Sequence, residues 1–192
     1  MRAEFTPRRL NCGDKALAGE DFVSETAQEY TARMLGLSAG KDPRAVQTAT
    51  PAKLRRIVER TPRRLLTRNP APGKWSIAQI VAHLADTEVV FAYRLRMILS
   101  RDGTEIQAFD QEKWADVVHY DRVNPADALG VFTSVRRANL ALVERLTPKQ
   151  RKQYGQHQER GKETIDHMQR MNAGHDLNHL GQIARILKSG QR

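Results

Sequence analysis

Four segments of the chain carry apolar residues at helical spacing, and this repeated pattern is the strongest constraint on its fold. In the clearest segment, five apolar side chains recur at intervals of three, four or seven residues: Ile80, Leu84, Phe91, Leu95 and Ile98. Such a stripe is typical of an amphipathic helix that packs against a partner. Similar stripes occur over residues 50–61, 124–147 and 164–188. Because each stripe needs another apolar surface to cover it, we predict an all-α fold, a four-helix bundle.

Prolines and capping residues predict where these helices begin and end. Thr50-Pro51 and Asn124-Pro125 each combine an N-cap residue with proline in the first turn, and Ser76 is the expected cap of the second helix. Thr61-Pro62 and Thr147-Pro148 are expected to end the first and third helices, because a residue before proline is pushed out of helical geometry.

The chain has the length of one domain with a single core. We expect residues 1–44 to form an N-terminal leader with one short helix over 24–37, and residues 45–192 to form the bundle domain. Helix-favouring residues dominate and β-branched runs are sparse, so no pair of strands is expected. The connection over 103–123 is longer than most loops and is expected to be functional or to pack on itself, with Phe109 and Trp114 as candidates for a pocket mouth.

The formal net charge of +10 raises the question of nucleic-acid binding. The excess is spread along the chain, with a net charge of +6 over residues 1–70 and +4 over residues 71–192. Its densest groups lack the interleaved aromatic residues that stack on bases, so a solvated surface is favoured over a nucleic-acid partner. No segment approaches the roughly 20 apolar residues of a membrane span, no secretion signal is visible, and Cys12 is the single cysteine. We therefore predict a cytoplasmic protein without a membrane partner.

A cluster of histidines is the clearest sign of chemistry. His175 and His179 are four residues apart within the fourth predicted helix, so both side chains project from one face, a turn apart. That face continues the inward stripe through Ile186. Two imidazoles leave a metal ion short of ligands, and His83, three residues after Ile80 at the edge of the second helical stripe, is the natural third. The sequence therefore predicts one divalent metal ion held by His83, His175 and His179.

Neighbouring residues bear on how such a site is built. Gly174 and Gly181 remove side chains beside the pair, so a neighbouring helix or a ligand can approach closely. Three polar residues are candidates for second partners of the rings: Asp86, Asp176 and Asn178.

Other interpretations of the histidines stay open at this point. A pair spaced in this way also occurs by chance, and such residues can be hydrogen-bonded core or surface side chains. No glutamate follows His175, so the metalloprotease signature and its built-in general base are absent, and we identify no catalytic or cofactor-binding residue. The remaining histidines are expected to be solvent-exposed: His119, His157 and His167.

Taken together, four short motifs resemble the DinB-like superfamily of bacterial four-helix bundles. They are PAPGKWS at residues 70–76, HLAD at 83–86, FDQ at 109–111 followed by Trp114, and HDLNHLGQI at 175–183. The resemblance covers about residues 45–188, and the combination is more specific than any one motif.

The resemblance implies a metal site more firmly than a reaction. In that family a histidine in the Trp-Ser helix and a His-x-x-x-His pair in the last helix bind a divalent ion, commonly zinc or nickel, which carries over to His83, His175 and His179. Family members often form homodimers, and some are transferases that use low-molecular-weight thiols such as bacillithiol or mycothiol. The leading hypothesis is therefore a metal-dependent thiol S-transferase or related detoxifying enzyme with a small-molecule substrate. The alternatives are a metal-dependent hydrolase and a non-catalytic metal-binding, stress-related module.

Overall fold

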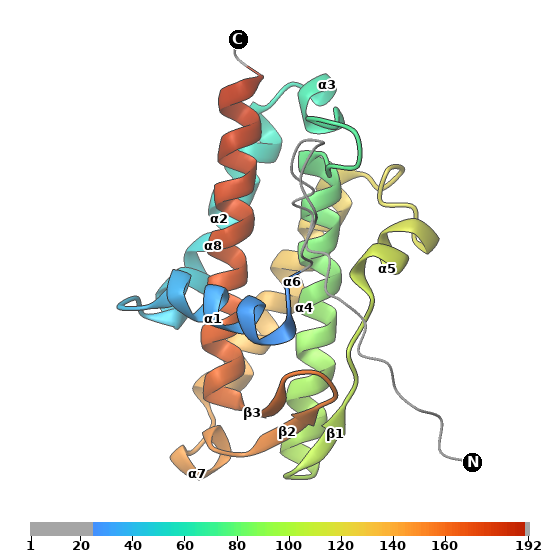
Figure 1. Cartoon of the computed structure of the whole chain (residues 1–192). Helices are drawn as coiled ribbons and strands as arrows, with labels where there is room; N and C mark the ends of the chain where they lie inside the picture. Colours follow the sequence, from blue (N-terminus) through green and yellow to red (C-terminus); the bar gives the residue numbers. More distant parts are fainter. Residues whose placement is uncertain (1–24, 191–192) are drawn as a thin grey trace, which may run out of the picture.

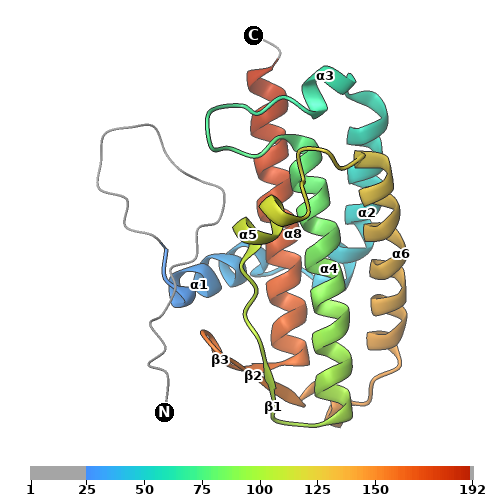
Figure 2. The same cartoon turned by 90° about the vertical axis from the view of Figure 1, so that its right-hand side faces the viewer.

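The computed structural model describes residues 25–190 and confirms the predicted all-α class and four-helix bundle. The four long helices are α2 (Pro43–Arg60), α4 (Ile77–Ser100), α6 (Pro125–Glu144) and α8 (Ile165–Ser189), and they lie side by side in Figures 1 and 2. Four shorter helices decorate the bundle: α1 (Ala27–Ser38), α3 (Arg63–Leu66), α5 (Gln111–Val117) and α7 (Pro148–Arg151). No helix between residues 25 and 190 is both long and apolar enough to cross a membrane.

The start of α2 differs from the prediction. Asp42 caps the helix and Pro43 occupies its first turn, so the expected start at Thr50-Pro51 is wrong, and the predicted boundary between residues 44 and 45 falls within the helix. Pro51 instead lies in the helix interior, where it cannot donate to the carbonyl oxygen of Gln47. The Arg136 guanidinium donates to that oxygen from α6 at 3.2 Å. A long-range hydrogen bond thus replaces the one that proline removes.

The other helix ends follow the sequence more closely. Ser76 forms a capping box with Gln79 at the start of α4, and α2 ends at Arg60, directly before Thr61-Pro62. The short helix expected over 24–37 is observed as α1, which ends at Ser38. The part of the expected leader that covers residues 1–24 lies outside the described residues.

Helix α1 crosses α8 in the middle of the bundle (Figure 1). A Cβ built on Gly174 of α8 would lie 1.9 Å from the main-chain oxygen of Met34 in α1, so only glycine permits this approach. The close contact expected at Gly174 is therefore present. At Gly181 the nearest atom to such a Cβ is the end of the Arg185 side chain at 3.8 Å, and no atom of another helix within residues 25–190 lies within 4 Å.

A small sheet was not expected from the sequence. It consists of β1 (Thr104–Ile106), β2 (Tyr154–His157) and β3 (Gly161–Thr164), with β1 parallel to β2 and β2 antiparallel to β3. The prediction that the chain has no strand pair is wrong. These strands have three or four residues each and lack the alternating β-branched pattern by which strands are recognised. The sheet lies beside the lower ends of α4 and α8 in Figure 1.

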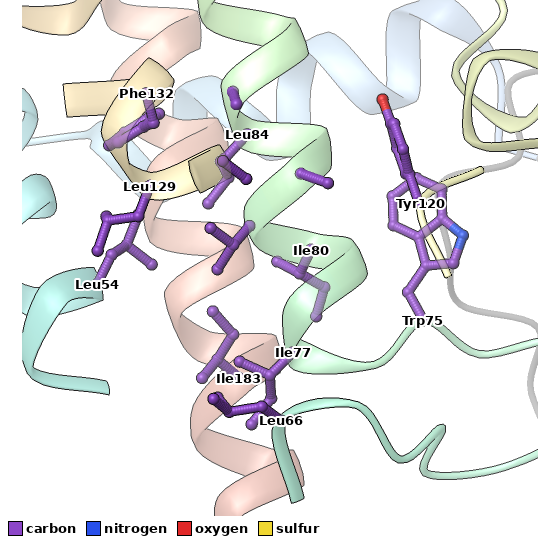
Figure 3. Packing of buried hydrophobic residues seen from close by; sticks show 14 of the residues in the cluster. Leu54, Leu66, Trp75, Ile77, Ile80, Leu84, Tyr120, Leu129, Phe132 and Ile183 are labelled. Carbon is purple, nitrogen blue, oxygen red and sulfur yellow. The ribbon is translucent and has the colours of Figure 1, made fainter. Parts of the chain in front are cut away.

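The apolar core fills the space between the long helices. Its larger cluster joins Leu54 of α2, Leu84 of α4 and Phe132 of α6, all nearly fully buried, as Figure 3 shows. A second cluster around Leu95 and Ile165 lies nearer the sheet. These clusters hold α4 and α8 in the positions from which their polar side chains meet.

Candidate metal centre

Helices α4 and α8 bring the three predicted histidines together inside the bundle. His83 is fully buried, and His175 and His179 expose 5% and 1% of their surface. The Nε2 atom of His175 lies 3.0 Å from Nε2 of His83 and 3.1 Å from Nε2 of His179. Each ring offers a nitrogen to a common point, with the three ligand atoms within 4.8 Å of one another.

The protons of three neutral rings cannot provide a hydrogen bond in both Nε2–Nε2 contacts of His175. Nδ1 of His179 lies 2.9 Å from the side-chain oxygen of Gln182, so we assign this ring its proton on Nδ1 and a lone pair on Nε2. If His175 carries its proton on Nδ1, its contact with His179 contains no proton. If His175 carries its proton on Nε2, it can donate this proton to His83 or to His179, but not to both. One of the two contacts therefore lacks a hydrogen bond in either tautomer.

Burial keeps two of the rings neutral. Desolvation, followed by the charge of neighbouring histidines, lowers the pKa of both His83 and His175 well below the usual value. Their Nδ1 atoms are buried and have no hydrogen-bond partner among the described residues. Buried polar groups without partners are costly, so these two Nδ1 atoms are left unsatisfied among residues 25–190.

The donor set fits a divalent transition metal. Two nitrogens that share one zinc ion at about 2.0–2.1 Å lie roughly 2.8–3.4 Å apart for bond angles between right and tetrahedral. The observed separations of 3.0 and 3.1 Å fall within this range. Neutral imidazoles suit zinc, nickel, copper and iron, and three of them leave a coordination position for an outside ligand.

Aromatic rings close one side of the cluster. Trp75, directly before the α4 cap, lies with its ring centroid 4.9 Å from that of His83 and packs edge-on against Tyr120 at 6.1 Å. The Tyr120 hydroxyl donates to Asp86 at 2.7 Å. Trp75 therefore anchors the start of α4 and shields one histidine from water.

The polar residues proposed as partners of the rings are engaged elsewhere. Asp86 accepts from Tyr120, Asn178 accepts from Arg33 of α1 at 2.9 Å, and Asp176 pairs with Arg136. Between residues 25 and 190, none of the three is hydrogen-bonded to a ring of the cluster. Sequence proximity did not indicate the direction of these side chains.

A buried network of ion pairs lies next to the histidine cluster and is centred on Arg136. Arg136 of α6 binds Asp176 of α8 through two hydrogen bonds of 2.6 and 3.0 Å, and it contacts Glu88 of α4 at 2.8 Å. Asn139 donates to Glu88 at 2.9 Å. Burial raises the pKa of Asp176, although the neighbouring Arg136 opposes the shift. Because Asp176 adjoins His175, this network positions the turn of α8 that carries this histidine.

A pocket opens beside two of the three histidines. Its walls come from α1, α4, α8, the segment 108–111 and the turn between β2 and β3. Four apolar side chains line its middle: Phe91, Phe109, Met168 and Met171. Phe109 is a lining residue, as expected, whereas Trp114 packs against the Phe109 ring at 5.1 Å and does not line the pocket.

The far part of the pocket carries charged residues that sequence reasoning missed, namely Arg94, Glu159, Arg160 and Glu163. The prediction that His157 is solvent-exposed is also wrong, because this residue is 1% exposed and belongs to β2 beside Arg94. His119 is exposed as expected, and His167 is partly buried. Charge patterns along the chain gave no signal for this group, because the unpredicted sheet brings it together.

Comparison with known proteins assigns this chain to a family. The sequence model of the DinB superfamily matches residues 48–183, which include all three histidines. The chain belongs to the DinB superfamily. The match leaves out helix α1, which nevertheless contributes Tyr30 to the pocket of this superfamily member.

Individual relatives agree with the assignment. A protein of Oceanobacillus iheyensis is 32% identical over 124 residues, covering 62% of this chain and 68% of its own length. A second protein of that organism is 26% identical over 117 residues, covering 60% and 67%. Both carry the name "putative metal-dependent hydrolase". The solved structure of YfiT from Bacillus subtilis, described as having "an unusual four-helix bundle topology", shares the fold with a TM-score of 0.72 at 20% identity, over 90% of this chain and 94% of that one.

Proposed function

We propose that this protein is a metal-dependent enzyme in which His83, His175 and His179 hold one divalent ion, with zinc as the first candidate and nickel as the next. The observation that supports the proposal is the convergence of three buried imidazole nitrogens whose contacts their own protons cannot satisfy. A bound ion supplies a Lewis acid that makes a thiol or a water more acidic and therefore more nucleophilic at neutral pH.

The protein's own residues would hold and orient a small-molecule substrate. Nδ1 of His179 is fixed by Gln182, which keeps Nε2 directed at the cluster. Trp75 packs against His83 and keeps water from that side. The apolar middle of the pocket would bind the body of the substrate next to His83 and His175.

Within this class we propose thiol S-transfer with a low-molecular-weight thiol as the reaction. The nearby carboxylates of Asp86, Glu88 and Asp176 are engaged with other side chains and do not offer a general base. A thiol is intrinsically more acidic than water, so a metal-bound thiol would lose its proton to solvent without a positioned base more readily than a bound water would, and this setting therefore favours thiol transfer. Hydrolysis is the second candidate, favoured by the name that the two relatives carry.

Metal analysis and turnover together test the proposal. We expect protein purified without a histidine tag to contain about one zinc or nickel per chain, and His179→Ala to lose it. Gln182→Leu, which removes a partner of the ring rather than a ligand, is expected to weaken zinc binding roughly 10- to 100-fold. Full-length protein that binds no divalent ion would contradict the metal site.

The reaction is then assigned by assaying the metal-loaded protein on a panel of electrophiles and esters, with and without added thiols. Turnover that requires a thiol supports S-transfer, and turnover without any thiol supports hydrolysis. Stoichiometric metal without turnover on either panel would contradict both reactions and favour a non-catalytic metal-binding module.

We also propose, from the family resemblance, that the protein is a cytoplasmic homodimer. Light scattering coupled to gel filtration should give about twice the chain mass of 21.8 kDa. A mass of one chain at all concentrations would contradict the dimer.

A further inference from the structure

The pocket extends from the histidines along a single face of α4. His83, Thr87, Phe91 and Arg94 follow one another at intervals of four, four and three residues, and all four line the pocket. Eleven residues separate the first from the last, a rise of roughly 16 Å along the helix. Arg94 stands at the far end of this row, where its Nη2 contacts the main-chain oxygen of Gln107 and Nε2 of His157.

Arg94 is a buried cation without a carboxylate partner. It is 8% exposed, and its Nη2 donates to the main-chain oxygen of Gln107. In the described part of the chain no residue is hydrogen-bonded to its Nε or Nη1, and no carboxylate lies within the 4.0 Å of an ion pair. By contrast, Arg160 is held by Glu163 through two hydrogen bonds, and Arg136 by Asp176 and Glu88.

The neighbouring imidazole does not satisfy the guanidinium either. Nδ1 of His157 accepts from the main-chain N–H groups of Glu159 and Arg160 at 3.1 and 3.3 Å. The proton of the neutral ring is therefore on Nε2. This atom lies 3.3 Å from Nη2 of Arg94, where two donors face each other.

Burial lowers the pKa of the Arg94 guanidinium but does not remove its charge at neutral pH. Desolvation, followed by the charge of Arg160, lowers its pKa to about 10. The side chain stays protonated at neutral pH, with donors left for a ligand in the pocket. A planar guanidinium pairs with the two oxygens of a carboxylate or of a phosphate. The carboxylate of Glu159 in the same pocket disfavours a doubly charged phosphate more than a singly charged carboxylate.

We propose that Arg94 binds the carboxylate of the substrate, whose reactive end lies at the histidines. This inference rests on the proposed function and adds the substrate class to it. Between the two ends Thr87 is polar, whereas Phe91 on α4 and Met168 and Met171 on α8 provide apolar surface. The ligand is therefore a monocarboxylate in which an apolar spacer separates the carboxylate from the reactive group.

Glu159 opposes the binding of a carboxylate in this pocket. Its side chain lines the same pocket, and its buried Oε2 has no hydrogen-bond partner between residues 25 and 190. A carboxylate at this position repels a ligand carboxylate and weakens its binding. Removing the charge at Glu159 should strengthen the interaction that Arg94 provides.

Calorimetry with matched acids and alcohols tests the assignment without any turnover. The full-length protein is titrated, with and without zinc, with 8-mercaptooctanoate and 8-mercaptooctanol, and with octanoate and octanol. We expect each acid to bind roughly 10- to 100-fold more tightly than its alcohol, the gain of a charge-assisted hydrogen bond. The acid 3-mercaptopropionate is too short to span the pocket and should show no such gain over 3-mercaptopropanol.

Variants identify the residue responsible. Arg94→Met should abolish the preference for the acid, and Arg94→Lys should retain part of it. Arg96→Met, which changes an exposed arginine on the same helix, should leave the preference as in the unmodified protein. Glu159→Gln should increase it. Thermal unfolding of each variant shows whether Arg94→Met folds, and the acid–alcohol comparison in the unmodified protein stands without that variant.

The outcomes separate this inference from the proposed function. Equal binding of octanoate and octanol, or no binding of octanoate at millimolar concentration, overturns the role of Arg94 whatever happens with zinc. A preference for octanoate in a protein that binds no zinc supports Arg94 while contradicting the metal enzyme. A preference that survives in a folded Arg94→Met variant also overturns the assignment.

Discussion

His157 shows how a single buried imidazole makes stability depend on pH. Burial, followed by the charges of Arg160 and Arg94, lowers its pKa in the folded protein to about 3, whereas the unfolded chain titrates near 6.5. Below about pH 6.5 the unfolded chain binds a proton that the folded protein does not. The free energy of unfolding therefore falls as the pH is lowered toward 3.

Replacing this residue should flatten the pH dependence. In His157→Gln, the loss of unfolding free energy between pH 7 and pH 5 should be about 2 kcal/mol smaller than in the unmodified protein. Urea unfolding at the two pH values measures both losses. Identical losses in the two proteins would show that His157 is protonated in the folded state as readily as in the unfolded chain.

Residues of the candidate site differ in how far sequence could predict them. His175 and His179 follow from a spacing of four within one helix, and His83 from its place beside a second apolar stripe, so the helical period alone indicated their convergence. Arg94 lies on the same helix as His83, but its lack of a carboxylate partner depends on where Glu163 and Arg160 point. That property is set by tertiary contacts and leaves no local pattern.

At the level of elements, the crossing of α1 over α8 depends on one glycine. Any side chain at position 174 meets the main-chain oxygen of Met34, an atom that cannot move without displacing α1. Gly174→Ala should therefore lower the free energy of unfolding by about 1–3 kcal/mol, despite the higher helix propensity of alanine. Chemical denaturation is the appropriate measurement.

Gly181→Ala is the matched control for this prediction, because it lies on the same helix with no backbone nearby. It should raise the free energy of unfolding by up to about 1 kcal/mol. If both substitutions stabilise the protein equally, α1 does not pack against α8 as described.

The start of a helix was predictable from the sequence where only one nearby residue could act as its cap. Ser76 caps α4 as its sequence predicts, because the capping box lies within four residues. Asp42-Pro43 and Thr50-Pro51 both satisfy the rule for a helix start, and the choice between them depends on Arg136, which is distant in sequence. The strands were missed for a similar reason, since their pairing rather than their composition defines them.

Across the whole molecule, Arg136 links all four long helices. It extends from α6 to Asp176 on α8, to Glu88 on α4 and to the carbonyl oxygen of Gln47 on α2. Removing it leaves two carboxylates buried without their cation. Arg136→Met should therefore lower the free energy of unfolding by about 3–5 kcal/mol, as measured by urea denaturation.

The neighbouring Arg137 provides the comparison, because it lies on the same helix but is exposed. Arg137→Met should change the free energy of unfolding by less than about 0.5 kcal/mol. Equal effects of the two substitutions would mean that the buried network contributes no more than a surface charge.

The pocket walls have a consequence for how such proteins can diversify. The histidines sit on long helices whose packing the core determines, whereas Tyr30, Phe109 and Glu159 come from a peripheral helix, a connecting segment and a hairpin turn. Insertions or exchanges in these short pieces can reshape the entrance while the helices that carry the three histidines stay intact. The same histidine cluster can in this way be given a different pocket by a change of the surrounding segments alone.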